Sequence, residues 1–133
     1  MHVQEATQED LSAVMTVFDS AMLETDVDTV REAIDRGDVL LAVREDRILG
    51  ACLLRGEEIE AIAVRQKRRD QGIATVLVEA AADDRDRLVA EFDRRVRPFW
   101  NSLGFDIEPL GGGDRYRAVL KTDEAEETDA ETT

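Results

Sequence analysis

A basic loop followed by a glycine carries the clearest chemical signal in the sequence. Four cations lie within five residues, namely Arg65, Lys67, Arg68 and Arg69. Gly72 follows, and the apolar residues after it recur at helical spacing. Unpaired N–H groups and the positive end of the dipole at a helix N-terminus attract phosphate, and glycine allows close approach. The loop therefore predicts an anion site, with a solvated charged loop as the alternative.

Two glutamates just upstream are candidates for proton transfer. Glu58 and Glu60 belong to an apolar stretch that is typical of a strand ending at Val64, and their spacing predicts that both point to one face. A carboxylate there could accept a proton from a substrate ammonium, directly or through water. Glu91, in a later strand-like stretch, is a third candidate. The alternative for each is a solvated strand residue in a chain rich in glutamate.

Two other kinds of chemistry are disfavoured by the composition. His2 is the only histidine and lies at the N-terminus, which argues against a serine or cysteine triad. Cys52 is the only cysteine, so the chain forms no internal disulfide or cysteine metal cluster, and we expect no metal. Its apolar surroundings indicate a small core residue.

The elements that must position these residues follow from the periodicity. Thr7 and Asp26 are expected N-caps, while Gly37 and Gly104 are expected helix stops. Pro98 either kinks its helix or marks a later start. The spacing predicts strands over 1–6, 39–44, 47–54, 57–64, 88–92, 105–110 and 115–121, and helices over 11–22, 27–36, 72–84 and 94–103. This order indicates a single α/β domain with a mixed central sheet flanked by helices.

Length and charge limit the organisation and the partners. Residues 1–121 are expected to form the domain, and residues 122–133, which are acidic and lack large apolar side chains, a disordered tail. A net charge of −14 disfavours nucleic acid and anionic membranes. No stretch is typical of a signal peptide or a membrane span, so a cytoplasmic location is expected. The acidity is also typical of proteins from organisms with molar salt in the cytoplasm.

Two motifs resemble those of the GNAT superfamily of acyl-CoA-dependent N-acyltransferases. Arg69-Asp70-Gln71-Gly72-Ile73-Ala74 matches the signature Q/R-x-x-G-x-G/A, and the strand before it resembles the fourth strand of that family. Downstream, the segment Phe99-Trp100-Asn101-Ser102-Leu103-Gly104-Phe105 is similar to the family segment F-Y-x-x-L-G-F. The expected order of elements is also that of the family, and it covers nearly everything before the tail.

The resemblance implies an acetyl-CoA site and a GNAT-type fold whose sheet is splayed between strands 4 and 5. Backbone N–H groups after Arg69 and Asp70 would hold the pyrophosphate, and the pantetheine would follow the end of the fourth strand. The cations Arg65, Lys67 and Arg68 are candidates for the 3′-phosphate. The implied acetyl-CoA contacts are Ile62, Ala63, Val64, Arg69, Asp70, Gln71, Gly72, Ile73, Ala74 and Thr75.

The family reaction is direct attack of a primary amine on the acyl thioester, which implies an N-acetyltransferase with Glu58 or Glu60 as general base. Surface acidity would favour a cationic acceptor. Trp100 departs from the family, since it replaces a tyrosine that protonates the leaving thiolate, and indole cannot serve as that acid. The alternatives are a non-catalytic acyl-CoA-binding module and a plain interaction domain. A homodimer is compatible with the resemblance.

Overall fold

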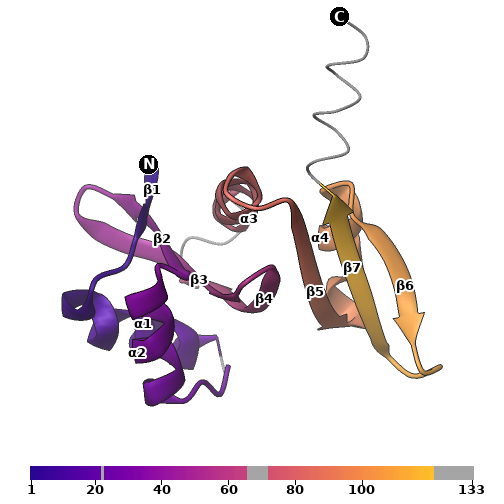
Figure 1. Cartoon of the computed structure of the whole chain (residues 1–133), viewed down its shortest axis with the longest axis horizontal. Coiled ribbons are helices and arrows are strands. Elements are labelled where there is room, and N and C mark those ends of the chain that lie inside the picture. The colour runs from indigo at the N-terminus through magenta and orange to yellow at the C-terminus, as the bar shows by residue number, and fades with distance from the viewer. Residues whose placement is uncertain (22, 66–71, 122–133) are drawn as a thin grey trace, which may run out of the picture.

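The computed structural model describes residues 1–21, 23–65 and 72–121, and these form strands and helices in the order expected from the sequence (Figure 1). The strands are β1 (His2–Glu5), β2 (Val39–Arg44), β3 (Arg47–Arg55), β4 (Glu58–Val64), β5 (Arg87–Asp93), β6 (Asp106–Leu110) and β7 (Arg115–Lys121). The helices are α1 (Leu11–Ser20), α2 (Val27–Arg36), α3 (Ile73–Asp83) and α4 (Arg97–Ser102), with short 3-10 turns η1 (Gln8–Asp10) and η3 (Arg94–Val96).

The strands form one seven-stranded mixed sheet in the order β1-β2-β3-β4-β5-β7-β6. Every neighbouring pair is antiparallel except β4 and β5, which are parallel and are connected through α3. The short turns that join β2, β3 and β4 require antiparallel neighbours, as the sequence predicts. The predicted α/β fold with a mixed sheet is therefore confirmed.

Helices cover both faces of the sheet (Figure 1), and the buried side chains form two apolar clusters, one on each face. The α1/α2 cluster joins Val14, Phe18 and Val30 to alternate residues of β2, β3 and β4, such as Leu41. The α3/α4 cluster joins α3 and α4 to the intervening residues of those strands and to β5. Strand alternation sends successive side chains to opposite faces, so one sheet supplies both clusters.

The ends of α2 carry the signals predicted from the sequence. The Asp26 carboxylate accepts a hydrogen bond from the Thr29 backbone N–H at 3.1 Å. Gly37 closes the helix with a φ of 80°, a left-handed conformation that suits glycine. Thr7 and Asp10 form a capping box, but this box begins the η1 turn and α1 starts only at Leu11.

The helix predicted over 94–103 is divided in the structure. Residues Arg94–Val96 form η3, and α4 starts at Arg97 with Pro98 in its first turn. A proline is tolerated there because the first helical N–H groups have no partner within the helix. The later start that Pro98 suggested is thus confirmed. Met22, the loop residues 66–71 and the predicted tail 122–133 lie outside the described residues.

An ion-paired network closes the end of the sheet at which β2 and β4 begin. The Asp38 carboxylate contacts Nη2 of Arg85 at 3.1 Å and Nε of Arg36 at 3.0 Å. It also accepts a hydrogen bond from the Gly56 backbone N–H at 3.3 Å, and Arg85 Nε donates to the Gly56 carbonyl at 2.8 Å. The network ties α2, the β3–β4 turn and the C-terminal end of α3 together.

Candidate functional site

A cleft opens where β4 and β5 separate. The two strands pair only at Glu58 with Val89 and at Ile59 with Ala90. Beyond these pairs lies a cavity of about 430 Å³ between the strand ends. Its walls are mostly apolar and include Ile62, Val64, Phe92 and Trp100. Backbone groups of separated strands are left without a neighbouring strand, so an extended ligand can lie between them.

A β-bulge in β4 falls at one of the two candidate bases. Leu54 of β3 pairs with Ile59, but the next residue, Leu53, pairs with Ala61, so Glu60 is the extra residue of the bulge. Ile59 packs in the α3/α4 cluster and Ala61 in the α1/α2 cluster, although they are two residues apart. The bulge interrupts the alternation between Ile59 and Ala61. Arg55, the cross-strand partner of Glu58, forms an ion pair with Glu60, so the expectation that the two glutamates share a face stays a prediction.

Of the two glutamates, Glu60 lines the cleft and Glu58 is not among its lining residues. Glu91, the third candidate, also lines it, from β5. Since the parallel register ends at Ile59 with Ala90, its continuation would place Glu60 beside Glu91 at the first open position. An arginine pairs with each carboxylate: Arg55 Nε is 3.0 Å from Glu60 Oε1, and Arg117 Nη2 is 3.1 Å from Glu91 Oε2.

The N-terminus of α3 lies at the wide end of the cleft. Gly72 has a φ of +77°, in the left-handed region, and caps the helix. The first helical hydrogen bond runs from the Val76 N–H to the Gly72 carbonyl at 3.0 Å. The N–H groups of Ile73, Ala74 and Thr75 precede it and have no partner within the helix, as at any helix N-terminus. These donors and the helix dipole favour an anion at this position.

Only some of the implied acetyl-CoA contacts line the cleft. Ala74 lines the cleft, while Ile73 is buried in the α3/α4 cluster. The predicted loop residues Arg69, Asp70 and Gln71 lie outside the described residues, as do Lys67 and Arg68. Ile62, Ala63 and Val64 all line the cleft, as the resemblance implies.

Arg65 anchors the base of the loop. Its backbone N–H donates to the Leu49 carbonyl at 2.9 Å, and its Nε donates to the Ile48 carbonyl at 2.6 Å. These bonds to β3 hold the half-buried Arg65 side chain against the sheet. Arg65, which the sequence suggested as a ligand of the 3′-phosphate, thus forms hydrogen bonds to the backbone of β3 in the structure.

Gly50 lets α3 pack closely on β3. A Cβ atom at this position would be 2.9 Å from the Ala63 carbonyl oxygen, 3.2 Å from Ile73 Cγ2 and 3.3 Å from Leu77 Cδ1. The glycine thus fixes how near the first turns of α3 come to the sheet, and with them the N–H groups at the mouth of the cleft.

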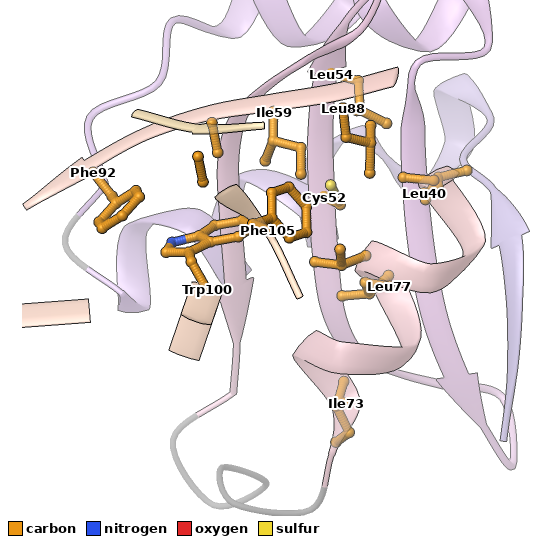
Figure 2. Packing of buried hydrophobic residues seen from close by; sticks show 14 of the residues in the cluster. Leu40, Cys52, Leu54, Ile59, Ile73, Leu77, Leu88, Phe92, Trp100 and Phe105 are labelled. Carbon is orange, nitrogen blue, oxygen red and sulfur yellow. The ribbon is translucent and has the colours of Figure 1, made fainter. Parts of the chain in front are cut away.

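Aromatic rings form the α4 side of the site, as Figure 2 shows for Phe92, Trp100 and Phe105. The Trp100 ring centroid is 5.8 Å from that of Phe92 and 5.1 Å from that of Phe105. Trp100 is 4% exposed and lines the cleft. Tyr116 stacks on the far side of Phe92 at 6.0 Å. At the position where the family tyrosine is expected, the structure thus has a packed indole.

The remaining reactive side chains lie elsewhere. Burial raises the pKa of the Cys52 thiol to about 12, so Cys52 is a core residue, as predicted. His2 Nε2 lies 2.8 Å from Gln4 Oε1 on β1, at an edge of the sheet. Within the described ranges, no group of His, Cys, Asp and Glu side chains could hold a metal ion. None of the described helices is long and apolar enough to span a membrane.

Several residues that line the cleft were not predicted from the sequence, and three of them come from other parts of the chain than β4 and β5. Leu23 follows α1, Val96 belongs to η3, and Arg115 begins β7. No motif in the sequence marks Leu23. Arg115 reaches the cleft only because β7 pairs with β5 through Asp93, and this register has no signature in the sequence.

The sheet separates between β4 and β5, and the first turn of α3 borders the cleft there through Ala74. The family described as acetyltransferase (GNAT) domain matches residues 3–108, which is most of the chain. The protein therefore belongs to the GNAT acetyltransferase family. No curated protein matched the chain.

Solved structures of the same fold agree with this assignment. A GNAT-family acetyltransferase from Bacillus cereus ATCC 10987 has a TM-score of 0.77 at 17% identity, covering 90% of this chain and 96% of its own. Rv2747 from Mycobacterium tuberculosis, solved with CoA and NLQ, has a TM-score of 0.70 at 18% identity, covering 91% and 99%. N-acetylglutamate synthase from Neisseria gonorrhoeae, solved with coenzyme A and N-acetyl-glutamate, has a TM-score of 0.68 at 15% identity, covering 91% and 35%.

Proposed function

We propose that the protein transfers an acetyl group from acetyl-CoA to a primary amine. The observation that carries the proposal is the cleft between β4 and β5, which runs from the α3 N-terminus to the carboxylates of Glu60 and Glu91. A helix N-terminus suits the pyrophosphate, and the separated strand ends suit an extended pantetheine. Two of the structures with this fold contain CoA, which supports the choice of thioester.

Glu60 would act as general base in this scheme. Glu60 first accepts a proton from the ammonium, and the amine nitrogen then attacks the thioester carbonyl carbon. The carbon–sulfur bond breaks, and the second amine proton leaves to water. Glu60 is favoured over Glu58 because it lies in the bulge and lines the cleft. Water would protonate the departing thiolate, since a thiol has a pKa of about 8.5 and the Trp100 indole is no acid.

A second candidate function is acyl-CoA binding without efficient turnover. The buried Trp100 in place of an acidic hydroxyl favours it. Calorimetric titration with acetyl-CoA, followed by a thiol-release assay against a panel of amines, separates the two. We expect binding and turnover with at least one amine. Binding with silence across the panel would favour the second function, and the lack of any binding would refute both.

Two matched variants test the role of Glu60. Glu60→Gln should lower kcat by about 10² to 10⁴, the usual contribution of a general base, with little change in acetyl-CoA affinity. Glu58→Gln, on the same strand, is the control and should retain the wild-type rate. Wild-type kcat in Glu60→Gln would remove it as the base.

The acidic surface fits a protein that works at high salt, which we also propose. None of the described residues that are buried is charged, so the carboxylates of this part of the chain contribute to surface repulsion that salt screens. Thermal unfolding followed by circular dichroism should give a higher Tm in molar KCl than at low salt. An equal or higher Tm at low salt would contradict this.

A further inference from the structure

Two charged side chains of the β5–β7 pair lie on the cleft side that faces away from α4. Ala90 and Phe92 pack in the α3/α4 cluster, so alternation points Glu91 to the opposite face. In the β5–β7 register, Phe92 pairs with Tyr116, and Asp93 pairs with Arg115. Because Tyr116 stacks on Phe92, Arg115 shares the face of Glu91. Both Glu91 and Arg115 line the cleft.

Arg115 differs from the other arginines around it. Arg55, Arg95 and Arg117 each form an ion pair with a carboxylate. Among the described residues, no ion pair within 4.0 Å joins the Arg115 guanidinium to a carboxylate. Its partner across the strands is Asp93, whose Oδ1 already accepts hydrogen bonds from the backbone N–H and the Nε of Arg95 at 3.0 and 3.2 Å. These hydrogen bonds lower the pKa of Asp93, and the charge of Arg115 adds only a smaller effect. The guanidinium is therefore available to a ligand in the cleft.

The cleft combines residues of both charges. Its lining residues include Glu60, Glu91 and Arg115, which carry charge, and Leu23 and Val96, which are apolar. Arg115 pairs with Asp93, two residues beyond Glu91, so it lies about 7 Å further along the strand at ~3.3 Å per residue. An arginine side chain spans this distance. A negative and a positive group of one small molecule can thus be held together.

We propose that the acceptor carries a carboxylate next to its amine, as an amino acid does. The ammonium lies between Glu60 and Glu91, and the carboxylate pairs with the Arg115 guanidinium, which suits bidentate binding of a carboxylate. This inference rests on the proposed acetyl transfer. It replaces the expectation of a cationic acceptor, because a zwitterion has no net charge and is not repelled by the acidic surface.

Matched acceptors test the proposal in the full-length protein. Thiol release is measured with L-leucine, L-phenylalanine and L-glutamine and with the carboxamide of each. Arg115→Gln should lower kcat/KM for the amino acids about tenfold to a hundredfold, as for the loss of a charge-assisted hydrogen bond, with little change for the amides. Arg115→Lys should recover part of the loss. Arg95→Gln is the control, since Arg95 is exposed at the same end and is not among the lining residues.

The outcomes separate this inference from the proposed function. The inference would be overturned if both the wild type and Arg115→Gln turned over the amides at least as fast as the amino acids. The proposed acetyl transfer would then remain intact. A rise in KM for acetyl-CoA alone in Arg115→Gln would assign the arginine to the cofactor and also overturn it. Silence with every amine, simple alkylamines included, despite acetyl-CoA binding would refute the transfer itself and the inference with it.

Discussion

Replacing Gly50 by alanine tests whether the approach of α3 to the sheet sets the acetyl-CoA site. The added Cβ would lie 2.9 Å from the Ala63 carbonyl oxygen. Close C–H···O contacts lie at about 3.3–3.6 Å, so β3, β4 or α3 must shift by a few tenths of an ångström. The other contacts, Ile73 and Leu77, are buried in α3, and the easiest movement is that of the helix.

The expected cost follows from two opposing effects. Overpacking a core usually costs about 1–3 kcal/mol, while replacing glycine with alanine restricts the unfolded chain and returns about 0.4–1 kcal/mol. The net loss is about 0.5–2 kcal/mol. For a domain of this size, 1 kcal/mol corresponds to a Tm change of roughly 3–5 °C, so the Tm should fall by about 2–10 °C. Displacement of the first turn of α3 should also weaken acetyl-CoA binding.

Calorimetry measures both effects on one sample, and Gly113→Ala is the control. A Cβ at Gly113 would meet no atom within 4 Å, so this variant should stay within about 0.5 kcal/mol of the wild type. If Gly50→Ala left both the Tm and the acetyl-CoA affinity unchanged, the close packing of α3 on β3 would not position the site.

Three further variants test other parts of the structure. Gly72→Glu should abolish acetyl-CoA binding in calorimetry, because it brings a negative charge to the α3 N-terminus and strains a residue with a φ of +77°; retained affinity would contradict the placement. Cys52 should resist iodoacetamide in the folded protein, and labelling without unfolding, read by mass spectrometry, would refute its burial. Its pKa is about 12 when folded and 9.0 in an ordinary thiol, so the thiol ionises first in the unfolded chain, and the free energy of unfolding should fall as the pH rises above about 9. Asp38→Asn should lower the free energy of urea unfolding by about 1–3 kcal/mol, because it removes the carboxylate that pairs with the 13% exposed Arg85. Breaking the exposed pair of Arg31 and Asp28 should cost less than about 1 kcal/mol.

Local signals in the sequence were reliable where a residue acts through its own backbone. Asp26 caps α2, Gly37 ends it in the left-handed conformation, and Gly72 begins α3 as predicted. Each of these effects depends on a few neighbouring residues. The turn between β3 and β4 is equally local, because short connections force antiparallel pairing.

The same kind of reasoning did not reveal the β-bulge in β4. Period-two alternation treats the strand as regular, whereas Glu60 is an extra residue between Ile59 and Ala61. A bulge arises from the pairing of two strands and from the packing on both faces, so the residues of one strand do not reveal it. Pro98, by contrast, predicted the late start of α4, because its ring fixes φ and it lacks a backbone N–H, which suits the first turn of a helix.

The sequence by itself determined the α/β order of elements, the glycine at the helix N-terminus and the membership that its two motifs indicate, since these depend on local periodicity and fixed spacing. The tertiary structure decided where the sheet opens, that Glu60 and not Glu58 lines the cleft, and that Glu91 and Arg115 join it. The physical reason is that strand register and the β4–β5 split depend on contacts between residues far apart in the chain. The chemistry of the site is carried by side chains that only those contacts bring together.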